Sequence, residues 1–127
     1  MDSIALIEEW TETRTGGIDP IHGVQDQAKY QRIMADLREN GWRGAPLVVD
    51  DTQALTGSHR FWAVHNLLHD EGIEIEIPRI DIADLCALFD VDWLAHRERF
   101  DDWIDAYIDI AEELPADVVA YLGMDMH

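Results

Sequence analysis

The hydrophobic pattern of the N-terminal part predicts two helices separated by an irregular segment. Over residues 3–12 the apolar positions fall on one side of a short helix that either Asp2 or Ser3 can cap. The glycines and the proline of "RTGGIDPIHG" interrupt this pattern and leave room for a short strand at 17–21. Helical spacing returns over residues 26–41, where Asn-Gly ends the second helix.

Short strands are predicted in the middle of the chain. "APLVVDDTQALTG" contains an apolar strand at 47–50, a turn, and a second strand at 53–56, which together form a hairpin. A third helix starts at His59. The alternating "EGIEIEIPRIDI" (71–82) has the two-residue period of a half-buried strand, and Pro78 indicates an edge position or a strand end.

The last third of the chain predicts helices only. Residues 84–89 form a short one, and residues 92–113 form a long one with Ile104, Tyr107 and Ile108 on its apolar face. A final helix opens at Pro115 and closes at Gly123. The whole pattern, without a repeat or a linker, predicts one α/β (α+β) domain over residues 1–127. In it, a small mixed sheet of three to four strands is packed by helices.

The net charge of the chain limits the classes of molecule that it is expected to bind. The 127 residues carry 27 acids and 9 bases, for a formal net charge of −18, and 47% of them are hydrophobic. Residues 81–127 hold 13 acids and 2 bases, so residues 83–127 are an acidic helical extension. A single lysine and eight scattered arginines give no basic patch, so direct DNA binding is not expected. The acidity fits either plain solubility, which we favour, or a surface that binds a basic protein.

The chain shows no targeting or membrane signal. It has no run of 18 apolar residues, and its first ten residues are acidic where a secretory signal is basic. The single cysteine, Cys86, lies in an apolar run and is expected to be a buried small hydrophobe. We therefore expect a cytoplasmic protein without an internal disulfide or a membrane span.

Four polar or flexible residues, "GSHR", stand where the hairpin meets the third helix. A helix start leaves amide N–H groups unpaired and attracts anions. Gly57 allows a ligand to approach the backbone, and Ser58 can cap the helix or donate to a phosphate oxygen. His59 offers a donor or a base, and Arg60 offers a forked donor. These residues alone leave open an anion site or a capped helix with solvent-facing charges.

The sequence "GWRGAPLVVDDTQALTGSHRFWAVHNLL", followed by "IEIEIPRIDI", resembles the core of the ParB/sulfiredoxin-like superfamily over residues 18–82. The shared features are a helix ending in glycine, a Pro-aliphatic-x-Val strand, a Gly-x-His-Arg motif opening a helix, and a strand with an Ile-Pro signature. This resemblance implies that the helix start wraps the phosphates of a bound ATP or CTP. The residues that it assigns to this site are Gly57, Ser58, His59 and Arg60, with Lys29, Gln27 and His22 as further contacts.

The chain departs from the two best-known branches of this superfamily. Ser58 stands where sulfiredoxins carry a reactive cysteine, which argues against sulfinic acid repair. Partition-type ParB proteins carry a glutamate and a second arginine in the motif, and a helix-turn-helix DNA reader, none of which is present. After these departures, the features that the chain still shares with the superfamily are the core and the phosphate-binding motif.

Two function classes follow. In the first, the chain is a nucleotide-binding domain with NTPase or phosphoryl-transfer activity, in which His59 orients a nucleophile and Asp50 or Asp19 holds Mg²⁺. A hairpin turn also favours aspartate, so Asp50 has a structural interpretation as well. In the alternative class, the chain is a non-catalytic acidic regulator, for example encoded by a phage or a plasmid. Such a regulator keeps the fold as a scaffold and binds a basic protein.

Two further features accompany the motif. His65 and His69 are four residues apart on one helix face, a spacing that can hold a metal, but the sequence offers no evident third ligand. We expect these two to be surface histidines. Trp62 stands next to the motif and is a candidate border of a base-binding pocket.

Overall fold

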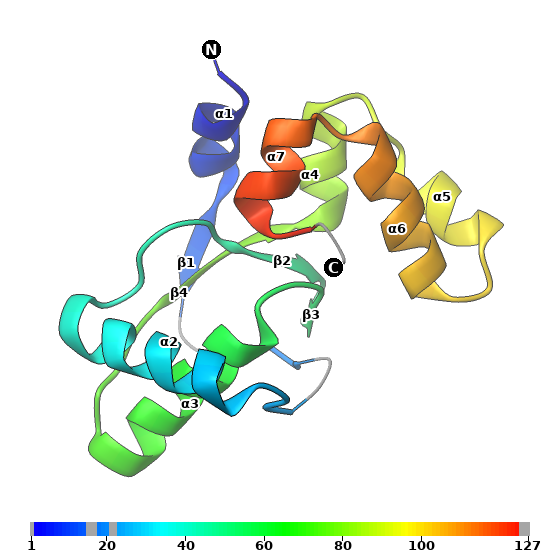
Figure 1. Ribbon diagram of the computed structural model, residues 1–127. Helices are drawn as coiled ribbons and strands as arrows, with labels where there is room; N and C mark the ends of the chain where they lie inside the picture. The colour runs from blue at the N-terminus through cyan, green and yellow to red at the C-terminus, as the bar shows by residue number, and fades with distance from the viewer. Residues whose placement is uncertain (1, 15–17, 21–22, 125–127) are drawn as a thin grey trace.

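The computed structural model describes residues 2–14, 18–20 and 23–124, and its strands form one mixed sheet (Figure 1). The sheet order is β1-β4-β2-β3. The strands are β1 (Glu12–Arg14), β2 (Leu47–Asp50), β3 (Gln53–Ala54) and β4 (Ile77–Asp81). β4 pairs in parallel with β2 and antiparallel with β1, while β3 pairs antiparallel with β2. The predicted α/β (α+β) class with a small mixed sheet is confirmed.

Helices cover both faces of this sheet. Figure 1 shows α2 and α3 on one side, and α1 with α4 to α7 on the other. Over the described residues the helices are α1 (Ser3–Trp10), α2 (Gln27–Asn40), α3 (Ser58–Glu71), α4 (Ile82–Leu88), α5 (Trp93–Arg99), α6 (Trp103–Glu113) and α7 (Ala116–Leu122). None of the described helices is long and apolar enough to cross a membrane.

The alternation of side chains along β2 divides the core into two clusters. Val48 packs with residues of α1 and α4 to α7, whereas Leu47 and Val49 pack with residues of α2 and α3. Ile80 of β4 joins the first cluster, together with Tyr107 of α6. The acidic C-terminal helices therefore cover one face of the same sheet that carries the candidate site on its other side.

The prediction for the first helix and strand was wrong in its boundaries. The helix expected to reach residue 12 ends at Trp10, because Thr11 is extended and its hydroxyl donates to the carbonyl of Ile7 at 2.7 Å. Residues Glu12–Arg14 then pair with β4. Of the segment at 17–21 where we expected a strand, the described residues show only an isolated bridge between Asp19 and Gln53.

The single long helix predicted over residues 92–113 was also wrong. Phe100 is extended, with φ −113° and ψ 143°, and Asp102 caps a new helix by accepting from the amide of Ile104 at 3.0 Å. The break turns α5 back along α6 (Figure 1). Tyr107 is buried as expected, but Ile104 and Ile108 are 37% and 39% exposed.

Other boundaries follow the sequence closely. The hairpin forms as predicted, although its second strand ends at Ala54, and the alternating segment is a strand only from Ile77. The third helix forms as well but begins at Ser58, one residue before the predicted start at His59. Cys86 is fully buried. Burial, with Asp81 and Glu113 adding to it, raises the pKa of this thiol to about 12. It therefore stays protonated at neutral pH and is not a nucleophile.

Candidate functional site

Among the described helices, α3 and α7 begin without a side-chain cap. Gly57 is the N-cap of α3, in the left-handed conformation with φ 72° and ψ 32°, and makes no side-chain hydrogen bond. Five other helices, α1, α2, α4, α5 and α6, are each capped by an aspartate. The alternative in which Ser58 caps the helix was wrong, since Ser58 is the first helical residue and is buried. A helix start without a side-chain cap is a place where an anion can accept from backbone amides.

A hollow of about 320 Å³ opens at this helix end. The lining residues come from the start of α2 and from the motif: Gln25, Lys29, Ile33, Gly57, Ser58, His59 and Arg60. Five of the seven residues proposed to contact phosphates are therefore together. Gln27 is exposed and does not line the hollow, and His22 lies outside the described residues.

His59 connects α3 to the start of α2. Its Nε2 accepts from the backbone amides of Gln25 and Asp26, at 3.3 and 3.1 Å. An acceptor nitrogen carries no proton, so these contacts favour the tautomer protonated at Nδ1. The Nε2 lone pair of His59 is therefore already used by these two amides. The contacts hold the segment before α2 against α3, and both segments line the hollow.

Arg60 connects α3 to the segment before β2. Its guanidinium donates to the carbonyls of Ala45 and Arg43, at 3.1 and 2.7 Å, and Cζ lies 4.1 Å from the ring centroid of Trp42. Burial lowers the pKa of Arg60, against the opposing effects of Asp36 and Tyr121. We expected the Arg60 guanidinium to bind phosphate, but its Nη1 and Nη2 groups instead hold the loop before β2.

Lys29 is the cation of the hollow whose side chain is exposed. Its backbone amide donates to the capping carboxylate of Asp26 at 3.0 Å, which places it in the first turn of α2. It is the single lysine of the chain, and it shares the lining with the uncapped end of α3. An ammonium on a flexible stem can reach an anion bound at that end.

The two acids expected to hold Mg²⁺ do not line the hollow. Asp50 ends β2, and its pKa is raised by burial and by the nearby carboxylates of Asp81 and Asp51, with Arg97 opposing. Asp19 is engaged at the hairpin, where its carboxylate accepts from the hydroxyl of Thr52 at 3.0 Å. Trp62 does not line the hollow either, and its ring packs edge-on against Phe61 and His65.

No protein-family model, curated protein or solved structure matches this chain.

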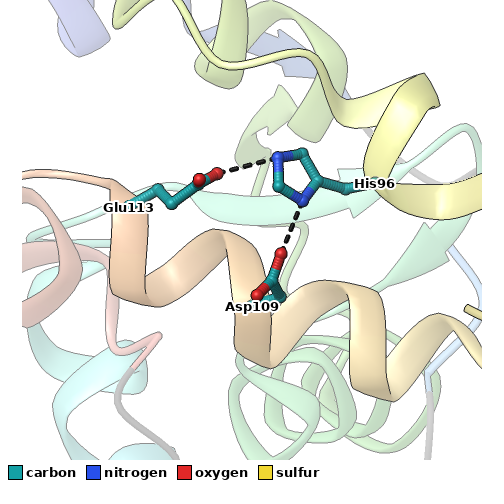
Figure 2. A group of neighbouring side chains, drawn as sticks. All are labelled: His96, Asp109 and Glu113. Atoms are coloured by element: carbon teal, nitrogen blue, oxygen red, sulfur yellow. Dashed lines mark hydrogen bonds and ion pairs between the residues drawn. The ribbon is translucent and has the colours of Figure 1, made fainter. Parts of the chain in front are cut away.

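The structure brings together a second group of polar side chains that was not found from the sequence. His96 of α5 lies between Asp109 and Glu113 of α6, with Nδ1 2.6 Å from one carboxylate and Nε2 2.8 Å from the other (Figure 2). In one continuous helix, the 13-residue separation of His96 and Asp109 would place them about 20 Å apart. The group exists because the chain turns at Phe100. In the sequence, only the four-residue spacing of Asp109 and Glu113 indicated that two carboxylates share one face of a helix.

Proposed function

We propose that this chain binds a nucleoside triphosphate, ATP or CTP, by its phosphates at the amino end of α3. This is the function implied by the resemblance to the ParB/sulfiredoxin-like core. The supporting observation is the hollow of about 320 Å³, which an uncapped helix start and the only lysine of the chain line together. A helix start carries about half a positive charge, and Lys29 adds a full one.

The residues of the hollow divide into groups that contact the ligand and groups that position them. Gly57 has no side chain, so phosphate oxygens can approach the amides of the first turn of α3. Lys29 neutralises phosphate charge from the facing helix. His59 and Arg60 are positioning residues in this proposal, because their contacts with backbone atoms hold α2 and the loop before β2 against α3. Binding, rather than catalysis by His59, is what this arrangement favours.

The net charge of −18 sets the conditions for binding. Long-range repulsion between this protein and a triphosphate is screened within about 8 Å at physiological salt, whereas contacts in the hollow are screened less. Mg²⁺ bound to the β- and γ-phosphates removes much of the ligand's own charge. We therefore propose the Mg²⁺ complex of the nucleotide as the ligand.

Lys29→Met is expected to weaken ATP or CTP binding about tenfold or more, because it removes a charged donor and keeps the length of the side chain. Calorimetric titration of the Mg²⁺-nucleotide into the full chain measures this effect. Arg38→Met is the matched control, since it removes one positive charge from the far end of the same helix, where Arg38 pairs with Glu71. If wild type binds neither nucleotide, or if Lys29→Met binds as wild type does, the proposal is wrong.

A second candidate function rests on the surface of α6. A shallow hollow of about 260 Å³ lies there, bordered by Phe100 and the exposed Ile108. Three acidic residues also line it: Asp105, Asp109 and Glu112. An apolar strip edged by acids fits an amphipathic basic segment of another protein. Binding of such a basic peptide should weaken as salt rises and should be the same in Lys29→Met. Binding that ignores ionic strength would remove this candidate.

A further inference from the structure

The cluster of His96, Asp109 and Glu113 is independent of the nucleotide hollow, and only its Asp109 also borders the shallow hollow beside α6. Asp109 and Glu113 are one turn apart on α6, and His96 reaches them from α5 (Figure 2). One nitrogen or oxygen atom from each residue lies within 4.8 Å of those from the other two. The group therefore gathers three ligand-type atoms from two helices into one small volume.

Burial distinguishes these residues from ordinary surface charges. His96 is 8% exposed, whereas the side chains of Asp109 and Glu113 are 32% and 49% exposed. The imidazole is thus enclosed, while one side of the group is open to solvent. The guanidinium of Arg99 approaches Asp109 at 3.9 Å and is a weak competitor at this distance.

We propose that His96, Asp109 and Glu113 form a binding site for a divalent transition metal of the Zn²⁺ type. Two carboxylates balance the charge of a dication, and an imidazole nitrogen selects transition metals over Mg²⁺ and Ca²⁺. Zn²⁺ takes nitrogen and oxygen ligands at about 2.0–2.2 Å, so ligand atoms around one ion are about 3–4 Å apart. Asp109 and Glu113 contact opposite nitrogens of the ring, so one carboxylate must leave its present nitrogen when a metal binds. The three ligand atoms start within 4.8 Å of one another, and water would fill the fourth position.

A bound metal would change how the cluster is held together. In the metal-free arrangement the imidazole lies between the two carboxylates and contacts each of them through one ring nitrogen. A metal would take one ring nitrogen as its ligand in place of one of these contacts. The bound ion would then join α5 to α6 across the turn at Phe100, and its binding energy would stabilise the folded chain.

The test is a titration of Zn²⁺ alone into chelator-treated full-length protein. We expect one equivalent to bind, and we expect the melting temperature to rise by roughly 5–10 °C at 100-fold excess over the dissociation constant. Glu113→Gln keeps the size of a half-exposed side chain and should weaken binding more than about tenfold. His96→Gln should abolish binding, and circular dichroism checks that each variant is folded.

The matched control is the double variant His65→Gln/His69→Gln on α3. These two rings, with centroids 4.3 Å apart, are the competing place for a transition metal. Retained binding in this double variant, with weakened binding in Glu113→Gln, supports the proposal. Absence of stoichiometric binding by wild type, unchanged binding in folded Glu113→Gln, or loss of binding in the double variant overturns it.

Discussion

Replacing Gly57 with alanine is expected to destabilise the protein by about 2–4 kcal/mol. Two effects add at this position. Gly57 has φ +72°, which a residue with a Cβ adopts only under strain, and the added Cβ would lie 2.1 Å from Cδ2 of Leu47. Leu47 is 1% exposed in β2 and has little room to move. The substitution must therefore displace either the helix start or the buried side chain of Leu47.

Gly72→Ala is the matched control for this prediction. Gly72 ends the same helix with nearly the same backbone angle, φ +69°, and an added Cβ would meet nothing within 4 Å. This variant should lose about 1 kcal/mol, from backbone strain alone. Urea denaturation of both variants measures the difference. Equal losses would show that the contact between Gly57 and Leu47 does not constrain the helix start.

The second large effect is expected for Arg60→Met, which should cost about 2–3 kcal/mol of unfolding free energy. Methionine keeps the apolar stem but leaves the carbonyls of Ala45 and Arg43 without their charged donor. It also removes the guanidinium from the ring of Trp42. Chemical denaturation, followed by the fluorescence of the tryptophans, measures this loss.

Arg38→Met provides the comparison here as well. Arg38 makes two hydrogen bonds to Glu71, at 2.9 and 2.7 Å, but both side chains are well exposed. Exposed ion pairs contribute little, so this variant should lose clearly less stability than Arg60→Met. A similar loss in both variants would mean that the contacts of Arg60 with the loop are no stronger than a surface pair.

Arg60 both lines the hollow and holds the loop before β2, and this complicates any binding experiment with an Arg60 variant. Loss of nucleotide binding in Arg60→Met would follow from a shifted loop as readily as from a lost phosphate contact. Lys29 is exposed and supports no such loop, so Lys29→Met separates binding from folding. The two variants should therefore be measured together.

Much of the fold is visible in the sequence where local signals are long or strongly patterned. The second helix ends at Asn40-Gly41 as predicted, and Asp50 and Asp51 lie at a two-strand hairpin. The three residues of β1 are too few to show a two-residue period, and their pairing with β4 is decided by distant sequence. Helical spacing also continued through residues 100–102, where aspartate capping overrides it.

The composition of the hollow was largely predictable, but the use of its side chains was not. A motif at a helix start and a lysine on the preceding helix come together as expected. Sequence alone could not show that His59 and Arg60 turn to backbone atoms, because those partners belong to loops of irregular conformation. It could not find the cluster around His96 either, since that depends on the sharp turn between α5 and α6.

The sheet order has a consequence for how a growing chain acquires its structure. β1 is made first, yet its partner β4 is made after α2, the hairpin and α3, and β4 must also join β2 in parallel. Until residues 77–81 have left the ribosome, β1 lacks its partner β4, and Val48 lacks α4 to α7, which complete its burial. Such late, long-range closure is slow and leaves apolar surface exposed during synthesis. During that interval the many repelling acids of this chain would keep nascent copies apart.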